Sequence, residues 1–246
     1  MEHIHLHTKR NRGYFLALII GLLFITAFSS CKKDNDEVQQ PDVSFITFVQ
    51  SSPLYSSLDF YIGGVRTTSA LLYTENSGRY LNGSTYLGIY SGPYFVQVGV
   101  GGSTQQLLGG TLNFEPNKSY SFFVTTKSAA TDSASAIITT DTLTAPSSGK
   151  AKIRFVNVGR STGAFDLAIQ NGATLFSNKA YNAYTSFTEV NAGTYTYVLK
   201  DAGTSTVRAT SQPLIVEGGR IYTIWAGGTS TGTGTSALSL NVIVNK

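Results

Sequence analysis

The sequence predicts an all-β chain, in which two tandem antiparallel β-sandwich domains of immunoglobulin-like architecture follow an N-terminal leader. Two observations predict this fold class. From Val43 onward, short runs rich in Val, Ile, Phe, Tyr and Thr alternate with clusters of Gly, Asn, Ser and Pro, as strands alternate with turns. The predicted strands include residues 44–50, 57–62, 94–100, 119–125, 152–158 and 194–199. The same motifs also occur twice in the same order, which is typical of a duplicated domain. Beyond residue 30 no stretch has the apolar period and the caps of a helix.

The first 30 residues have the order of a signal peptide. The basic residues Lys9, Arg10 and Arg12 precede an apolar run at 14–28. An apolar run of about 15 residues suits a signal peptide, whereas a transmembrane helix needs roughly 20. We therefore expect residues 1–30 to be removed on export. An uncleaved anchor helix and an ordinary signal peptide that leaves a free thiol are the alternatives.

Cys31 is the one cysteine of the chain, and it directly follows Ser29 and Ser30. This ending resembles the lipobox of bacterial lipoproteins, in which the cysteine becomes the first residue of the mature protein and carries the lipid. Phe28 stands where the lipobox usually has Leu or Val. The resemblance implies that Cys31 is a lipidation site and that the chain is held at a membrane by its lipid.

Residues 31–42 are polar and charged, and they predict a flexible tether behind the lipidated cysteine. The run at 32–37 contains three acidic residues directly after the cysteine. It resembles the export signal of Bacteroidetes lipoproteins, which implies an outer-membrane, cell-surface-facing location. A generic solvated linker and a periplasm-facing anchor are the alternatives.

Removal of the leader would exclude several kinds of chemistry. The three histidines of the chain, His3, His5 and His7, all lie in it, and Cys31 is committed to the lipid. The mature chain then has no nucleophile–His pair, no zinc site with His or Cys ligands and no internal disulfide. The basic residues are scattered and the formal net charge is only +4, so we expect no nucleic-acid partner. We predict no enzymatic activity, no cofactor and no metal.

The repeated motifs divide the rest of the chain into a first copy at 43–144, a linker at 145–150 and a second copy at 151–246. The paired anchors of the two copies are, in chain order, residues 46–49 and 153–156, Asp59 and Asp166, Gly92 and Gly193, Tyr94 and Tyr195, and Tyr120 and Tyr222. The first copy also contains a short insertion between Val65 and Tyr86. We interpret this arrangement as a tandem duplication of a unit of about 100 residues, the size of an immunoglobulin-like domain.

The motifs of the second copy resemble those of the domain of unknown function 4397 family. The residues concerned are the opening strand at 151–157, the Ala-Gly-x-Tyr turn at 192–195 and the Gly-x-x-Tyr-Thr motif at 219–223. The resemblance extends to the first copy through the internal alignment, and so to a tandem pair. It implies a β-sandwich and an exported location, and it implies no activity.

A period of two along single strands predicts which residues face the core. Tyr94, Val96 and Val98 share one face of a strand, and Tyr195 and Leu199 share one face of its counterpart. Two packed sheets with such faces form a sandwich. The aromatic residues predicted to fill the two cores are Phe48, Phe60, Phe114 and Phe122 in the first copy and Phe155, Phe165 and Trp225 in the second.

Asp59 and Asp166 are the most site-like pair because they recur at equivalent positions. Calcium ligation would need several further oxygen ligands, and neither aspartate has a second acid nearby in the sequence. We therefore expect each carboxylate to accept backbone N–H bonds at the start of a strand. The repeated glycines and tyrosines, Gly92, Gly193, Tyr94 and Tyr195, are expected to be structural anchors as well.

The richest hint of binding is a group of tyrosines in or beside the insertion of the first copy, namely Tyr73, Tyr80, Tyr86 and Tyr90. Exposed tyrosines among small polar residues form adaptable recognition surfaces. The alternative is that tyrosine simply covers a β-sheet, for which it has a high propensity.

These observations predict a non-enzymatic outer-membrane lipoprotein that displays two β-sandwich domains for binding or adhesion at the cell envelope. One alternative is a glycan-binding accessory lipoprotein that uses the tyrosines of the insertion, and a second is a structural spacer of the envelope. The expected partners are the membrane, through the lipid, and a glycan or an envelope protein.

Overall fold

The structure is a computed structural model, and it describes residues 42–246. The predictions for the signal peptide, Cys31 and the tether up to residue 41 lie outside the described residues. Within the described part the secondary structure consists of β-strands and two short 3₁₀ turns, η2 (Ser77–Tyr80) and η3 (Gly234–Ser236). None of its helices is long and apolar enough to cross a membrane. The predicted all-β class is confirmed.

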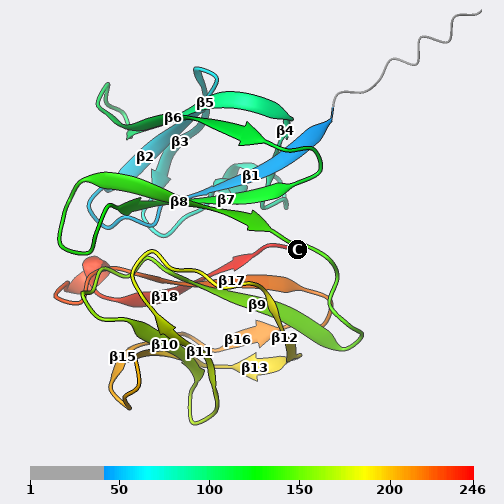
Figure 1. Cartoon of the computed structure of the whole chain (residues 1–246), viewed down its shortest axis with the longest axis vertical. Helices are drawn as coiled ribbons and strands as arrows, with labels where there is room; N and C mark the ends of the chain where they lie inside the picture. Colours follow the sequence, from blue (N-terminus) through cyan, green and yellow to red (C-terminus); the bar gives the residue numbers. More distant parts are fainter. Residues whose placement is uncertain (1–41) are drawn as a thin grey trace, which may run out of the picture. The chain divides into compact units, whose positions relative to one another are not determined.

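The first half of the described chain forms two four-stranded sheets (Figure 1). In order across the first sheet, the strands are β4 (Leu87–Tyr90), β1 (Val43–Val49), β7 (Ser119–Thr126) and β8 (Ala134–Asp141). In order across the second sheet, they are β3 (Val65–Leu72), β2 (Ser57–Ile62), β5 (Gly92–Val100) and β6 (Gln106–Phe114).

The second half repeats this arrangement. One sheet has the order β12 (Thr188–Asn191), β9 (Lys150–Asn157), β17 (Ile221–Gly227) and β18 (Ser239–Val244). The other has the order β11 (Thr174–Lys179), β10 (Phe165–Ile169), β14 (Tyr197–Asp201) and β15 (Val207–Thr210). A separate two-stranded sheet pairs β13 (Gly193–Tyr195) with β16 (Leu214–Val216).

Each half contains one parallel strand pair that the sequence pattern did not indicate. β1 lies parallel to β7 and β9 lies parallel to β17, whereas the other pairs between named strands are antiparallel. Parallel neighbours need a long crossover connection, and the intervening strands of the opposite sheet supply it. The side-chain period of two is the same in parallel and antiparallel pairs, so it carries no information about strand direction.

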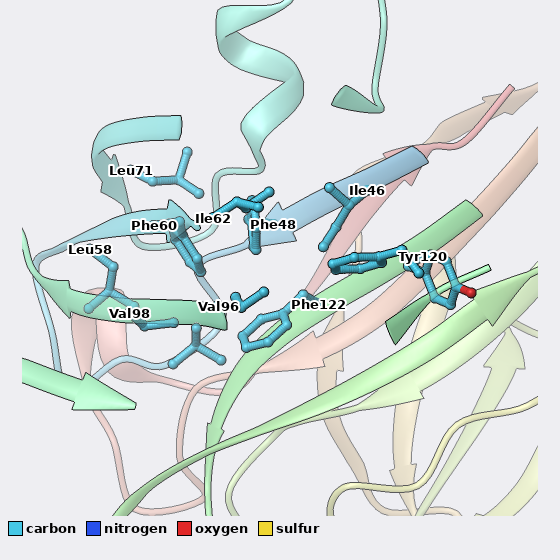
Figure 2. Packing of buried hydrophobic residues seen from close by; sticks show 12 residues of the cluster. Ile46, Phe48, Leu58, Phe60, Ile62, Leu71, Val96, Val98, Tyr120 and Phe122 are labelled. Atoms are coloured by element: carbon cyan, nitrogen blue, oxygen red, sulfur yellow. The ribbon is translucent and has the colours of Figure 1, made fainter. Parts of the chain in front are cut away.

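The core of the first half lies between its two sheets. Phe48 of β1, Phe60 of β2 and Phe122 of β7 form its centre, where the Phe48 and Phe60 ring centroids are 4.6 Å apart (Figure 2). The second half has an equivalent core around Phe155, Phe165 and other apolar side chains. Seven predicted core aromatics are buried, and each buried side chain of this kind contributes roughly 1.5–3 kcal/mol.

Trp225 is buried in a different place from the one predicted. It belongs to a third apolar cluster, formed by the outer faces of the sheet that contains β1 and of the sheet that contains β9. Phe123 of β7 packs edge-on against it, with ring centroids 6.3 Å apart. The remaining fully or nearly fully buried members of this cluster are Val49, Val156, Val158 and Ile243. The two halves therefore pack against each other through this third apolar core, which is separate from the core inside each sandwich.

Two tyrosines make the same hydrogen bond at equivalent positions of the two sandwiches. The hydroxyl of Tyr120 accepts the backbone N–H of Glu115 at 3.0 Å, and that of Tyr222 accepts the N–H of Glu217 at 3.0 Å. This is the hydrogen bond of a tyrosine corner. It explains why Tyr120 and Tyr222 stand at matching positions of the repeated motifs.

The predicted strand at 194–199 is divided in the structure. β13 ends at Tyr195 and β14 begins at Tyr197, and the two belong to different sheets. At the break the N–H of Tyr197 donates to the hydroxyl of Ser211 at 2.9 Å. A side-chain hydroxyl thus replaces the backbone carbonyl of a neighbouring strand as the acceptor. The alternation of apolar and polar residues contains no sign of this change, so it could not predict the break.

Candidate functional site

Tyr86 is buried, so its prediction as part of an exposed ligand surface is wrong. Its side chain lies between the two halves of the described chain. Its hydroxyl donates to Asp141 Oδ2 at 2.6 Å and accepts from Asn245 Nδ2 at 2.7 Å. Burial, and then the neighbouring Asp141 carboxylate, raise the pKa of the Tyr86 phenol well above its ordinary value. The residue is a polar link within the fold.

Tyr73 is half-buried and also faces the second half. The Tyr73 hydroxyl lies close to Gly227 of β17, and a methyl group on Gly227 would stand only 2.9 Å from this hydroxyl. Burial raises the pKa of the Tyr73 phenol. Tyr73 therefore packs against the end of β17, and it does not form a free binding surface.

Tyr80 and Tyr90 are the two exposed members of the predicted group, at 43% and 62% exposure. The Tyr80 hydroxyl donates to the carbonyl of Ser69 on β3, and the Arg79 guanidinium lies 5.7 Å from the centre of its ring. Tyr90, on β4, instead lines an open hollow of about 520 Å³ together with Tyr94. The four tyrosines thus have four different surroundings, and the structure does not bring them together as one surface.

Asp59 and Asp166 are buried and bind backbone N–H groups of their own sandwich. Asp59 Oδ1 accepts from the N–H of Ala70 at 2.6 Å. Asp166 accepts from Asn178 at 2.7 Å and from Gly203 at 3.0 Å. Ala70 and Asn178 both have a positive φ, of 50° and 53°, a conformation that costs energy for residues other than glycine. Each carboxylate therefore stabilises an irregular point in the neighbouring strand.

The repeated Gly-x-Tyr positions also have structural surroundings. Gly92 and Gly193 have φ values of 131° and 157°, which L side chains rarely adopt. Tyr94 packs against Phe114 with ring centroids 6.2 Å apart, and the Tyr195 hydroxyl donates to the carbonyl of Asn191 at 3.1 Å. These residues shape the chain where β5 and β13 begin.

A buried ion pair between the two halves is the main feature that sequence reasoning missed. Arg154 Nη1 lies 2.6 Å from Asp141 Oδ1, and the two side chains are 2% and 0% exposed. Arg154 also donates from Nε to Thr223 at 2.8 Å and from Nη2 to Ser121 at 3.1 Å. Thr223 in turn donates to Asn245 at 2.7 Å. We call this network, together with the apolar cluster around Trp225, the inter-sheet layer.

The sequence did contain a signal for this network. Arg154 interrupts an apolar strand at the position that Thr47 occupies in the first copy. A charged residue in such a place is rarely buried unless it is paired. The sequence alone could not name its partner, because Asp141 belongs to the other half of the chain.

A small cleft of about 240 Å³ opens over Arg154, with Lys152 and Phe187 among its lining residues. The Arg154 guanidinium lies 4.6 Å from the centre of the Phe187 ring, and its hydrogen bonds go to side chains of the chain itself. The Lys152 ammonium donates to the carbonyl of Thr144 at 2.9 Å. Both cations of this cleft are thus engaged within the fold.

A second hollow, of about 300 Å³, lies on the outer face of the sheet that contains β2 and β5. We call it the Tyr61 groove and define it by Tyr61, Gln97, Gly99, Ser103, Gln105 and Gln106. Tyr61 and Gln97 face each other in the register of β2 and β5. Gln97 Nε2 donates to Gln106 Oε1 at 3.2 Å, and Gln106 Nε2 donates to the carbonyl of Leu108 at 3.3 Å. These defining residues are uncharged.

Among residues 42–246, no group of three or more His, Cys, Asp and Glu side chains is arranged to hold a metal ion.

A protein-family model described as a domain of unknown function, DUF4397, matches residues 44–168 of the chain. The match covers just over half of the sequence. The chain belongs to the DUF4397 family. The matched region includes the strands of the first half except the first residue of β1, and it continues through β9 and most of β10. That the second half is a further copy of the DUF4397 domain stays a prediction.

No curated protein matches the chain. Among solved structures, the Bacillus anthracis TIE protein is similar at 11% identity and a TM-score of 0.25, over 76% of this chain and 34% of that protein. The chain thus spans about a third of the TIE protein. A CBM26 domain of Eubacterium rectale Amy13K, solved in complex with maltoheptaose, is similar at 11% identity and a TM-score of 0.23. That match covers 82% of this chain and 95% of the domain.

Proposed function

We propose that this DUF4397 protein is a non-enzymatic lipoprotein of the outer membrane, anchored through Cys31, that displays its two sandwiches as one rigid unit for binding at the cell envelope. The inter-sheet layer carries the proposal. A protein that displays a binding surface at the end of a flexible tether needs that surface to be held on one stable unit, and the layer removes a hinge between the two sandwiches.

The layer supports rigidity because it combines apolar packing with a buried ion pair. Interfaces between domains of one chain normally permit relative motion unless they are large and hydrophobic. Here Trp225 and Phe123 are fully buried between the sheets. Separation of the halves would also expose Arg154 and Asp141 and would break each hydrogen bond that crosses the layer.

The segment between β8 and β9 is fastened to the second half as well. The carboxylate of Glu189 on β12 accepts the backbone N–H of Ser147 at 2.8 Å and the Ser147 hydroxyl at 3.0 Å. These bonds lower the pKa of the Glu189 carboxyl below its ordinary range. The connection between the two sandwiches is therefore held to the second sandwich at Ser147 and, through Lys152, at Thr144, which supports a rigid unit.

The structural-spacer alternative draws support from the same layer, because a spacer also needs two sandwiches that do not move against each other. The two functions differ in whether a ligand binds. The glycan-binding alternative loses its original surface, since Tyr86 and Tyr73 are occupied within the fold.

The anchor is tested by replacing Cys31 with alanine in the native host. The unaltered chain should fractionate with the outer membrane and carry the mass of a lipid, whereas Cys31→Ala should lose both. Protease added to intact cells should remove the unaltered protein, and a periplasmic protein serves as the protected control. Unchanged mass and membrane association of the variant would overturn the anchor, and protection in intact cells would overturn surface display.

A further inference from the structure

We propose that the Tyr61 groove is a binding site for a neutral saccharide. The inference deepens the proposed function, because it names a ligand class for a protein proposed to bind at the envelope. The site differs from the insertion tyrosines singled out by the sequence. It lies on the outer face of the sheet, opposite the core of the first sandwich, and the inter-sheet layer does not cover it.

The shape of the groove depends on a missing side chain. Gly99 forms part of its floor, opposite Asp59 in the register of β5 and β2. A methyl group on Gly99 would stand 3.1 Å from the carbonyl oxygen of Gln105 and 3.9 Å from the Tyr61 ring. Any larger residue would therefore fill the space beside the ring. The volume of about 300 Å³ is at the small end of ligand sites, which suits a short stretch of saccharide.

The chemistry of the groove suits a ligand with many hydroxyl groups. A sugar hydroxyl both donates and accepts hydrogen bonds, and so does each glutamine amide. Gln97, Gln105 and Gln106 line the groove together with Tyr61, its one aromatic residue. A pyranose ring can lay its apolar C–H face on the Tyr61 ring while its hydroxyls reach the amides around it.

Charge in and around the groove disfavours an ionic ligand. The nearest ionic groups on the same sheet are Arg66, opposite Tyr61 in the register of β3 and β2, and Asp59. These two side chains pair with each other, with Arg66 Nη1 3.5 Å from Asp59 Oδ2. No uncompensated charge of either sign therefore faces the groove from these strands, and a carboxylate or phosphate would find no counter-charge there.

The second sandwich shows that the fold does not require this groove. In the matching register of β10 and β14, Ala168 faces Val198 and Asp166 faces Lys200. Alanine, valine and lysine thus stand where the first sandwich has Tyr61, Gln97 and Gly99. Ala168 and Val198 are also buried. The aromatic ring, the amide and the bare glycine are features of the first sandwich alone.

The test uses the full chain, purified in a detergent without a sugar headgroup, and a panel of soluble neutral oligosaccharides derived from glucans, mannans, galactans and xylans. Binding is measured by saturation-transfer NMR and by calorimetry. Tyr61→Leu and Gln97→Leu should each weaken binding about tenfold, the effect of losing one well-placed contact. Tyr90→Leu, an exposed tyrosine outside the groove, is the matched control and should leave the affinity unchanged.

Three results would overturn the proposal. They are binding of no neutral saccharide in the panel, equal loss of affinity in the Tyr90 control, and binding only of an anionic ligand whose affinity falls steeply with salt. If Tyr61→Leu fails to fold, the exposed Gln106→Leu decides the question. Because binding is measured on purified protein, its failure is separate from a failure of the anchor, which is measured in cells.

Discussion

Replacing Arg154 with methionine should destabilise the protein far more than the loss of a surface ion pair would. The Arg154–Asp141 pair is buried, with side chains 2% and 0% exposed and a separation of 2.6 Å. Methionine keeps much of the volume of the side chain and removes its charge. Asp141 would then stay buried without its cation, which typically costs about 3–5 kcal/mol. In a protein of this size the melting temperature should fall by roughly 6–20 °C.

Trp225 provides the assay. It is the one tryptophan of the chain, and it is fully buried in the inter-sheet layer. Urea unfolding followed by its emission therefore reports on the layer itself. The midpoint should move to lower urea in Arg154→Met, while the slope of the transition stays unchanged.

Arg220→Met is the matched control, because Arg220 pairs with Glu217 at 3.2 Å while both side chains are more than half exposed. Its loss should cost no more than about 1 kcal/mol. The double variant Arg154→Met with Asp141→Asn should lose less than the sum of the two single variants, since neither charge is then left unpaired. Equal effects of Arg154→Met and Arg220→Met, or strict additivity in the double variant, would refute the reasoning.

Three further predictions concern the packing and the pH dependence of the fold. Gly228→Ala should prevent folding, because a methyl group there would come within 2.0 Å of a carbonyl oxygen, whereas Gly219→Ala should lower the free energy of unfolding by only about 1–2 kcal/mol, because both glycines have a positive φ but nothing lies within 4 Å of a methyl group at Gly219. Soluble yield and circular dichroism compare the two variants, and equal behaviour would contradict the steric argument. Phe123→Ala should lower the free energy of unfolding by about 3–5 kcal/mol and shift the Trp225 emission to the red, since the Phe123 and Trp225 ring centroids are 6.3 Å apart. An unchanged emission spectrum would mean that Phe123 does not shield Trp225 in the inter-sheet layer. Because the pKa of Tyr86 is raised in the folded protein, the stability that its phenol contributes is complete below about pH 10 and is lost as the pH rises further. In Tyr86→Phe, the free energy of unfolding should therefore fall less steeply above pH 10, by up to about 1.4 kcal/mol per pH unit. Urea unfolding at a series of pH values measures this slope, and equal slopes in the two proteins would exclude the role.

The strands and the core aromatics could be predicted because they depend on local patterns. The strand predicted at 57–62 coincides with β2, and the one predicted at 119–125 differs from β7 by one residue. Burial of Phe48 and Phe155 follows from alternation along single strands. The position of Trp225 did not follow in this way, because both faces of β17 are buried and alternation cannot distinguish one core from another.

The predicted tyrosine surface failed for a related reason. Composition indicated that tyrosines near the insertion could bind a ligand, but exposure depends on what covers them. Tyr86 is covered because its hydroxyl meets Asp141 and Asn245, one from each half of the chain. The Tyr61 groove was overlooked because Tyr61, Gln97 and Gln106 are brought together only by sheet register.

The sequence by itself determined the all-β class, the order of the strands along the chain and the burial of the core aromatics, because the hydrophobic period and the turn residues are local properties. It also determined the repetition of motifs, which the two halves show again as matching strand orders. The tertiary structure alone decided which strands run parallel, that Arg154 meets Asp141, and which tyrosines remain exposed. These outcomes depend on contacts between residues far apart in the chain. Strand pairing within each sandwich decides the parallel neighbours, and the packing of one sandwich on the other buries Arg154, Asp141 and Tyr86.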